Sequence, residues 1–288
     1  MQKNDAKRSS TLRVSLGRAC VALATWLVTA CETNSNGNGG NVAAPADDDD
    51  GNPTVSAESL ARGGALYDKW WAVADLPEPS GDHPLWSTRP DTASNTRTGP
   101  DTWRCKECHG WDYQGVDGAY GEGSHRTGFP GVLGTTLSRQ QLFDIIANDE
   151  STTAGGHGYS GAGLGENDIN SLVDFLEAGL VSMDDLVDES GAFLGDVTRG
   201  ETLYQDGIAG AISCSACHGA DGLTPPPGAP ADYDHFIGDV AGENPAEFQH
   251  KVRFGQPGTD MPAAVAEGGS LTDVRDLAAF SQTLPEGP

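Results

Sequence analysis

Two short motifs hold the residues of this chain whose types and spacing are best suited to chemistry. Residues 105–109 read Cys-Lys-Glu-Cys-His and residues 214–218 read Cys-Ser-Ala-Cys-His, so both follow the pattern C-x-x-C-H. In this pattern two thiols form thioethers with the vinyl groups of a haem, and the adjacent imidazole binds its iron. A chain with 6 Cys and 7 His among 288 residues shows the pattern by chance only about 0.003 times.

The two copies therefore predict two covalently bound haem c groups. The predicted thioether positions are Cys105, Cys108, Cys214 and Cys217, and the predicted proximal iron ligands are His109 and His218. Two other uses of four cysteines are open: two disulfides in an oxidising compartment, or zinc held by two C-x-x-C pairs. Neither alternative requires a histidine directly after each pair.

The first 30 residues have the composition of an export signal. Five basic residues precede or border an apolar run from Ala19 to Ala30, which is too short for a transmembrane helix of about 20 residues. Residues 28–31, Val-Thr-Ala-Cys, resemble a bacterial lipobox. The resemblance implies cleavage before Cys31 and lipidation of that cysteine, while Cys20 is discarded. An ordinary signal peptide with an incidental cysteine is the alternative.

The segment that follows indicates a tether. Residues 31–55 are rich in Asn and Gly, include the acidic run Asp47–Asp50 and contain no aromatic residue, so we expect a disordered acidic linker. Glu32 in place of Asp resembles lipoproteins sorted to the outer membrane. We therefore expect an exported, lipid-anchored protein on the periplasmic side of the outer membrane or at the cell surface. No later segment is apolar enough to cross a membrane.

The charge balance excludes one class of partner and favours another. The chain has 17 Lys and Arg against 42 Asp and Glu, and removal of residues 1–30 leaves 12 against 41, a net charge of −29. Nucleic-acid binding rests on clustered cations, so it is excluded. The carboxylates instead favour redox protein partners with basic docking surfaces, reached through electrostatic steering.

An internal repeat accompanies the two motifs. Residues 62–67, Arg-Gly-Gly-Ala-Leu-Tyr, match residues 199–204, Arg-Gly-Glu-Thr-Leu-Tyr, and each predicts an N-terminal helix with a small residue on one face. Residues 168–176 parallel residues 272–280, and both have apolar positions three and four apart, which predicts amphipathic helices. Short helices are expected over 140–147, with Ser138 as N-cap, and over 246–254.

This order of helix, haem motif, loop, short helix, loop and terminal helix resembles that of class I cytochromes c. Both halves, residues 56–182 and 190–288, share the resemblance. It implies an all-α fold with two cytochrome c-like domains, each a few short helices packed around a covalently bound haem c. The first half departs from the family by about 28 extra residues between Tyr67 and Cys105, an irregular Trp- and Pro-rich insertion. We expect it to wrap over the first haem, either as packing or as a docking surface.

The sixth iron ligands are expected in loops. Residues 253–262 resemble the axial-Met loop of class I cytochromes c, which implies Met261, 43 residues after His218, as a ligand. The corresponding region of the first half offers His157, 48 residues after His109, and predicts a haem with two histidine ligands. Three alternatives, and a vacant sixth position, stay open. The alternative ligands are His125, Met183 and His83.

These features predict a membrane-anchored dihaem electron carrier rather than a catalyst, and no catalytic residues are expected. Methionine ligation raises the reduction potential of a haem, so electrons should run from the His109/His157 haem to the His218/Met261 haem. The alternatives are a dihaem oxidoreductase, such as a peroxidase or a small-molecule dehydrogenase, and the carrier subunit of a larger respiratory complex.

Overall fold

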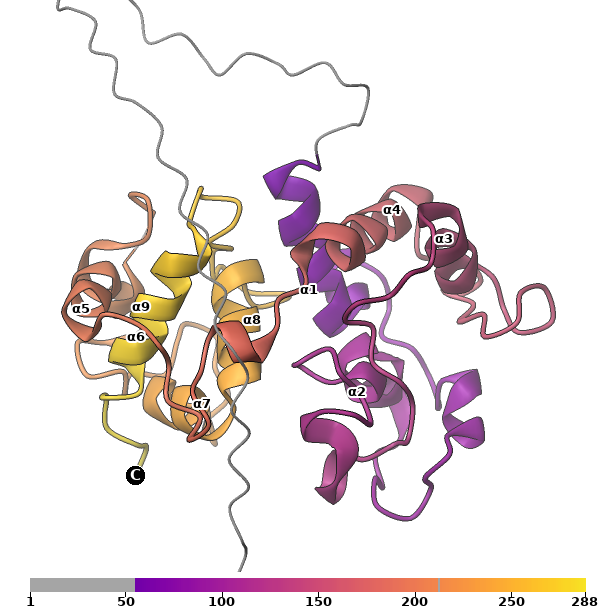
Figure 1. Cartoon of the computed structure of the whole chain (residues 1–288), viewed down its shortest axis with the longest axis horizontal. Helices are drawn as coiled ribbons and strands as arrows, with labels where there is room; N and C mark the ends of the chain where they lie inside the picture. The colour runs from indigo at the N-terminus through magenta and orange to yellow at the C-terminus, as the bar shows by residue number, and fades with distance from the viewer. Residues whose placement is uncertain (1–54, 212) are drawn as a thin grey trace, which may run out of the picture. The chain divides into compact units, whose positions relative to one another are not determined.

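A computed structural model describes residues 55–211 and 213–288, and all regular structure in these two ranges is helical (Figure 1). The predicted all-α class is therefore confirmed. The predicted signal peptide over residues 1–30, the lipidation site Cys31 and all but the last residue of the predicted linker lie outside the described residues. Within the described ranges, no helix combines the length and apolar character needed to span a membrane. The helices are α1 (Ala57–Val73), α2 (Cys105–His109), α3 (Arg139–Ala147), α4 (Glu166–Asp174), α5 (Val197–Asp206), α6 (Cys214–His218), α7 (Ile237–Glu243), α8 (Pro245–Phe254) and α9 (Leu271–Ser281).

Two pairs of helices cross at glycines, α1 with α4 and α5 with α9 (Figure 1). A Cβ on Gly63 of α1 would lie 2.0 Å from the carbonyl oxygen of Ser171, and one on Gly200 of α5 would lie 2.0 Å from that of Asp276. The backbones thus touch at a distance that excludes any side chain. This confirms the small residue expected on one face of each N-terminal helix.

Ion pairs set the register of these crossings. Arg62 Nε lies 2.5 Å from Asp168 Oδ1, and Arg199 pairs with Asp273 at the equivalent place. Asp168 therefore corresponds to Asp273, so the alignment of 168–176 with 272–280 is wrong by one residue. Apolar positions three and four apart tolerate such a slip, whereas a charge pair and a glycine contact do not.

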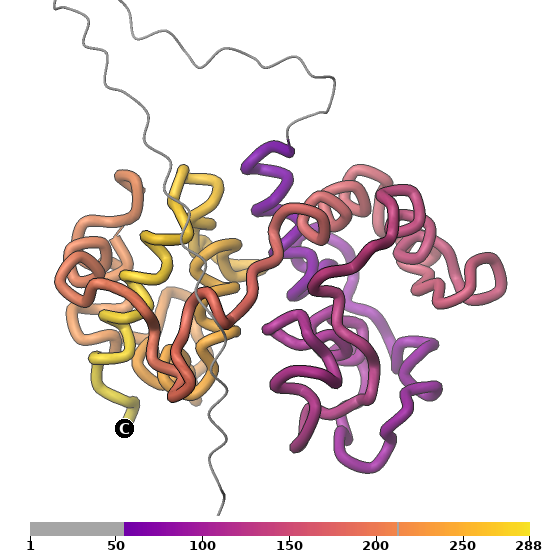
Figure 2. Tube along the Cα trace, in the orientation of Figure 1, coloured from indigo at the N-terminus to yellow at the C-terminus, as the bar shows by residue number. Residues whose placement is uncertain are grey.

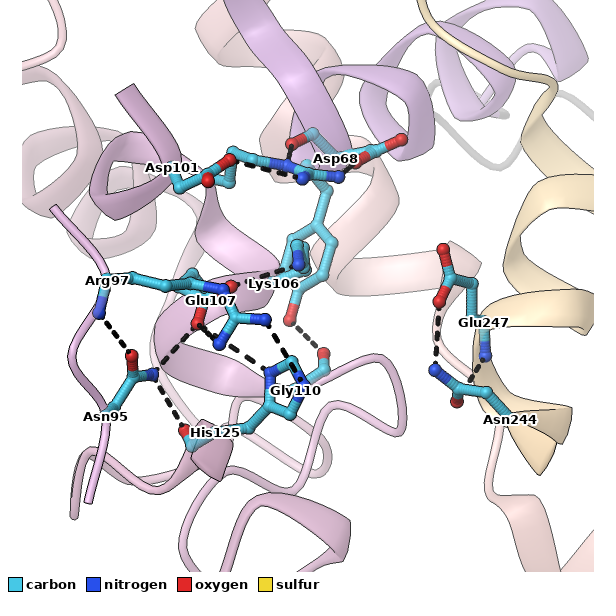
Figure 3. Close-up of polar contacts among 12 residues, drawn as sticks. Asp68, Asn95, Arg97, Asp101, Lys106, Glu107, Gly110, His125, Asn244 and Glu247 are labelled. Carbon is cyan, nitrogen blue, oxygen red and sulfur yellow. Dashed lines mark hydrogen bonds and ion pairs between the residues drawn. The ribbon is translucent and has the colours of Figure 1, made fainter. Parts of the chain in front are cut away.

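The short helices begin as their capping residues predict. Ser138 Oγ accepts the backbone N–H of Gln141, and the Gln141 side chain accepts the N–H of Ser138, a reciprocal capping box that starts α3. Asn244 caps α8 by accepting the N–H of Glu247 at 3.2 Å (Figure 3), with Pro245 at the first helical position. Both helices start one residue before the predicted bounds.

The insertion before α2 is an ordered loop held by tryptophans. The long connection from α1 to α2 can be followed in Figure 2 and contains two 3₁₀ turns, Pro84–Thr88 and Gly99–Trp103. Trp86 is buried, and its Nε1 donates to the carbonyl of Arg97 at 3.0 Å. Trp103 Nε1 donates to the carbonyl of Gly81 at 3.0 Å. Indole N–H groups thus satisfy carbonyls of a segment that has no long helix of its own.

Helix α8 follows the second motif in sequence but packs against the helices around the first. His250 of α8 is fully buried, and its Nε2 donates to the carbonyl of Gly64 in α1 at 2.9 Å. Its Nδ1 therefore accepts, and the Tyr113 hydroxyl donates to it at 2.8 Å. The ring of Phe254 meets that of Phe175 edge-on at 5.1 Å. The described residues consequently belong to one compact unit.

Buried charges join α1, α2 and α8. Asp68 of α1 is 1% exposed and pairs with both Arg104, which directly precedes α2, and Lys251 of α8. Burial alone would raise the pKa of Asp68, but Lys251 and Arg104 hold it well below its usual range. The charged group is therefore compensated from two sides, as a buried carboxylate must be.

Glu107 forms a second buried network inside the first motif (Figure 3). Its carboxylate is fully buried and accepts from Asn95 Nδ2 at 2.9 Å and from Lys106 Nζ at 3.0 Å, with Arg97 at 3.3 Å. Burial alone would raise its pKa, but the neighbouring His125, the charge of Lys106 and the Asn95 contact lower the pKa to about 2. This network connects Asn95 and Arg97 of the insertion to Glu107 of α2.

The close helix contact at Gly200 predicts that replacing two helical glycines by alanine has opposite effects on the stability of the protein. Gly200→Ala should destabilise the protein by about 1–3 kcal/mol, because the added methyl group has no room against the backbone of α9. Gly242→Ala is the matched control, since Gly242 lies in α7 with open space around its Cβ position. There the better helix propensity of alanine should add up to about 1 kcal/mol. Equal effects on the free energy of unfolding in guanidinium would contradict the crossing.

The Glu107 network predicts a pH-dependent loss of stability. A carboxylate whose pKa is lowered on folding stabilises the protein above its unfolded value of 4.5, and this contribution is lost as the pH falls towards about 2. Glu107→Gln should remove this part of the acid sensitivity. It should also cost about 3 kcal/mol at neutral pH, because Lys106 would be left buried without its counter-charge.

The measurement is the free energy of unfolding of both proteins at pH 7, 5 and 3. Glu267→Gln, at an exposed loop position, is the control and should behave as the parent protein. A Glu107→Gln variant with unchanged stability at pH 7 would show that the network contributes nothing.

Candidate haem sites

Each C-x-x-C-H motif forms one short helix that ends at a glycine. Gly110 after α2 and Gly219 after α6 have φ values of +81° and +76°, a conformation that favours glycine. The carbonyl of Gly110 accepts the hydroxyl of Tyr67 at 2.7 Å, and that of Gly219 accepts the hydroxyl of Tyr204 at 2.7 Å. The tyrosine that ends each sequence repeat thus fixes the end of the motif that follows it.

The four motif cysteines are free thiols, so the structure contains no disulfide between them. In the ranges 55–211 and 213–288 no group of three or more His, Cys, Asp or Glu side chains is placed to hold a metal ion, as a zinc site of this kind requires. Burial raises the pKa of Cys105 and of Cys214 to about 11.

His109 is held in the tautomer that a haem ligand needs. Its Nδ1 lies 2.7 Å from the carbonyl oxygen of Pro130, which can only accept, so Nδ1 carries the proton. Nε2 therefore keeps its lone pair for a metal. Burial lowers the pKa of His109, which keeps the imidazole neutral as ligation requires.

His157 lies next to His109, as the bis-His prediction requires. The two ring centres are 6.1 Å apart and the planes are inclined by 34°. Two imidazoles on opposite sides of one metal place their ring centres about 6 Å apart, since each metal–nitrogen bond is roughly 2 Å and each ring centre lies about 1 Å beyond its nitrogen. The buried Nδ1 atom of His157 has no hydrogen-bond partner among the described residues. The residues present thus fit an iron held between the rings.

The backbone around His157 is tied to α3. Its N–H donates to the carbonyl of Ile145 at 2.7 Å, and the following N–H groups of Gly158 and Tyr159 donate to Asn148 and Ile146. Burial, together with the neighbouring His109 and His83, lowers the pKa of His157 to about 3, so the ring is neutral. Helix α3, started by its capping box, is therefore the element that carries this loop.

The alternative ligands predicted for the first haem have other contacts in the structure. The ring of His125 stacks on Tyr120 at 4.8 Å, and its Nδ1 lies 3.8 Å from Glu107 behind the motif. Met183 begins a 3₁₀ turn and packs against the hydrophobic core that contains Phe248 of α8. His83 lies beside the pair, but its Nε2 is bonded to the carbonyl oxygen of His157 at 3.1 Å.

The second motif is followed by a loop that is fastened to α8. His218 ends α6, and burial lowers its pKa. Met261 lies in the loop between α8 and α9, three residues before Ala264, whose N–H donates to the carbonyl of Val252 at 3.0 Å. Gly255, with φ of +77°, lets the loop fold back, since a Cβ there would lie 2.7 Å from the carbonyl oxygen of Met261.

Two residues near the first motif have roles that sequence reasoning missed. His250 is buried between Tyr113 and α1, and His83 bonds to the backbone carbonyl of His157. Neither role has a local sequence signal, because each depends on contacts between distant parts of the chain.

Comparison with known proteins bears on the second half of the chain. A family model described as cytochrome c oxidase, cbb3-type, subunit III matches residues 195–280. No curated protein matches the chain. The matched segment contains α5, the motif in α6, Met261 and most of α9. Residues 195–280 are thus a c-type cytochrome domain, which implies a covalently bound haem c and a role in electron transfer.

Proposed function

We propose that this protein is a membrane-anchored dihaem c-type cytochrome that transfers electrons between redox partners outside the cytoplasm. The observation that supports a haem in the first half is the 6.1 Å separation of the His109 and His157 rings. His109 is the last residue of a complete C-x-x-C-H motif. This half of the chain lies outside the segment matched by the family model, so its case rests on geometry.

The first half repeats the contacts that frame the matched domain. Tyr67 bonds to the glycine after α2 just as Tyr204 bonds to the glycine after α6, at the same distance of 2.7 Å. Gly63 meets α4 as Gly200 meets α9. Because both halves have the motif together with the same tyrosine and glycine contacts, we propose the same cofactor for both.

The proposed attachment residues divide into two sets. Cys105, Cys108, His109 and His157 would hold one haem, and Cys214, Cys217, His218 and Met261 the other. When bound, haem supplies a reversible one-electron iron couple whose potential depends on its axial ligands. Two firm axial ligands at each iron leave no position for a small substrate, which favours a carrier over an enzyme. The higher potential given by methionine favours the second haem as the electron acceptor.

The N-terminal segment supports export and anchoring. A cleavable signal over residues 1–30 would deliver the chain to the compartment where haem c is attached, and the proposed lipid on Cys31 would retain it at a membrane. Residues 31–55 would act as a flexible acidic tether between the lipid and the folded part. The proposed location is the periplasmic side of the outer membrane or the cell surface.

The charge of the second half supports a basic partner. Residues 190–288 hold 14 Asp and Glu against 4 Lys and Arg. Three of these cations are already engaged: Arg199 with Asp273 and Asp276, Lys251 with Asp68, and Arg253 with the carbonyl of Gly179. The second half thus carries a clear excess of carboxylates, which steer cationic proteins at low ionic strength.

The proposal predicts two haems per chain. The mature protein, produced with haem-attachment machinery, should contain two iron atoms and two haems. The double variant Cys105→Ala/Cys108→Ala and the double variant Cys214→Ala/Cys217→Ala should each retain one. If a variant fails to fold, mass spectrometry of protease fragments from the parent protein should find haem on both peptides. One haem per parent chain would contradict the proposal.

Electrostatic steering predicts a salt effect on electron transfer. The rate of reduction by a cationic redox protein should fall as the salt concentration rises from about 0.01 M to about 0.15 M, where the screening length shortens from roughly 30 Å to 8 Å. Reduction by a small neutral reagent is the control and should not change. Rates indifferent to salt would contradict steering. They would favour the second candidate, a carrier within a stable respiratory complex, which the description of the matched family also suggests.

A further inference from the structure

We infer that His83 is a positioning residue that holds His157 in place as an iron ligand. The inference rests on the proposed His109/His157 haem, and it gives the insertion between α1 and α2 a specific task. His83 contributes no ligand atom itself; it acts through a hydrogen bond to the backbone of His157.

Both ring nitrogens of His83 are assigned by their partners. The backbone N–H of Leu85 lies 3.1 Å from Nδ1 and donates to it, so Nδ1 carries no proton in the neutral ring. Nε2 therefore carries the proton and donates it to the carbonyl oxygen of His157 at 3.1 Å. Neither nitrogen is left for a metal, so His83 supports the ligand instead of replacing it.

The ring of His83 is itself firmly held. It is 6% exposed and lies edge-on to Trp103, with ring centres 4.6 Å apart, and 5.6 Å from the ring of Tyr159. Its backbone N–H donates to the hydroxyl of Thr102 at 2.8 Å. Trp103 and Thr102 lie two and three residues before Cys105, so His83 connects the approach to that motif with the loop of His157.

The loop of His157 needs such a support because of its composition. Gly155 and Gly158 have φ values of +76° and +74°, and Gly156 lies between Gly155 and His157. Glycines add conformational freedom that has to be restrained for a ligand to stay in place. The N–H of His157 is restrained by Ile145 of α3, and its carbonyl oxygen by His83. The peptide units on both sides of the residue are thereby fastened.

In the second half, which has no such insertion, the loop of the proposed ligand is held in a different way. Its Met261 loop is fastened by backbone hydrogen bonds from Ala264 and Val265 to α8, at 3.0 Å and 3.2 Å. The connection from Tyr204 to Cys214 is correspondingly short. The first half thus adds a side-chain contact, from His83 to the carbonyl of His157, to the backbone bonds that tie the His157 loop to α3.

The test is the rate at which carbon monoxide binds to the reduced protein, followed in stopped flow together with the EPR spectrum of the oxidised protein. His83→Phe keeps the bulk of the ring but cannot donate to the His157 carbonyl. It should bind carbon monoxide roughly tenfold faster than the parent, the loss expected for one buried hydrogen bond, and should show a new high-spin fraction. His83→Gln, which keeps an N–H donor, should lie between the two.

Two further variants separate the outcomes. His235→Phe changes an exposed histidine that does not contact His157, and should leave carbon monoxide binding unchanged. His157→Ala should open the iron fully and bind carbon monoxide fastest. If His83→Phe does not fold, the intermediate rate of His83→Gln tests the same contact.

Fast binding by His157→Ala with parent-like binding by both His83 variants would overturn the clamp and leave the haem ligation intact. If His157→Ala also matches the parent, the ligand assignment itself is wrong and the clamp is overturned with it. Fast carbon monoxide binding and loss of the low-spin signal in His83→Phe, with parent-like behaviour of His157→Ala, would show that His83 is itself the ligand.

Discussion

The close backbone contact between N- and C-terminal helices is the constraint on which both proposed haem sites depend. At Gly63 and Gly200 the helices meet with no side chain between them. This contact sets the position of the tyrosine four residues later, Tyr67 or Tyr204, whose hydroxyl bonds to the glycine carbonyl after the motif. The cysteines and the proximal histidine are thereby placed by helix packing rather than by the loop that carries them.

The two halves differ in how the loop with the proposed sixth iron ligand is held. In the second half the loop of Met261 is fastened to α8 by its own backbone. In the first half the loop of His157 contains three glycines, and the insertion supplies His83 as an additional support. Helix α8 packs against both halves. One face, with Phe248 and Val252, belongs to the hydrophobic core of the second half, and the other places His250 and Lys251 against α1. Such sharing gives the two motifs a rigid common frame.

Sequence reasoning recovered the features that local patterns encode. The motifs, the N-cap at Ser138 and the repeated helices follow from spacing and residue type. The terminal helices were misaligned by one residue, because the apolar pattern alone also allows Asp168 to be matched with Thr272. The matching ion pairs, Arg62 with Asp168 and Arg199 with Asp273, and the glycine contacts show the true register.

The roles of His83 and His250 were out of reach of such patterns. His83 bonds to a residue 74 positions away, and His250 to one 137 positions away. Contacts between residues so far apart in the sequence depend on the fold, so local spacing and residue type do not predict them.

The central claim, that His109 and His157 bind one iron while His218 and Met261 bind another, is tested most directly by EPR of the oxidised mature protein. The account predicts two low-spin ferric signals of equal intensity, one typical of bis-histidine ligation and one of histidine–methionine ligation. A high-spin signal from the first haem, or a single low-spin species, would contradict it, because the ring separation of 6.1 Å leaves room for one iron held from both sides.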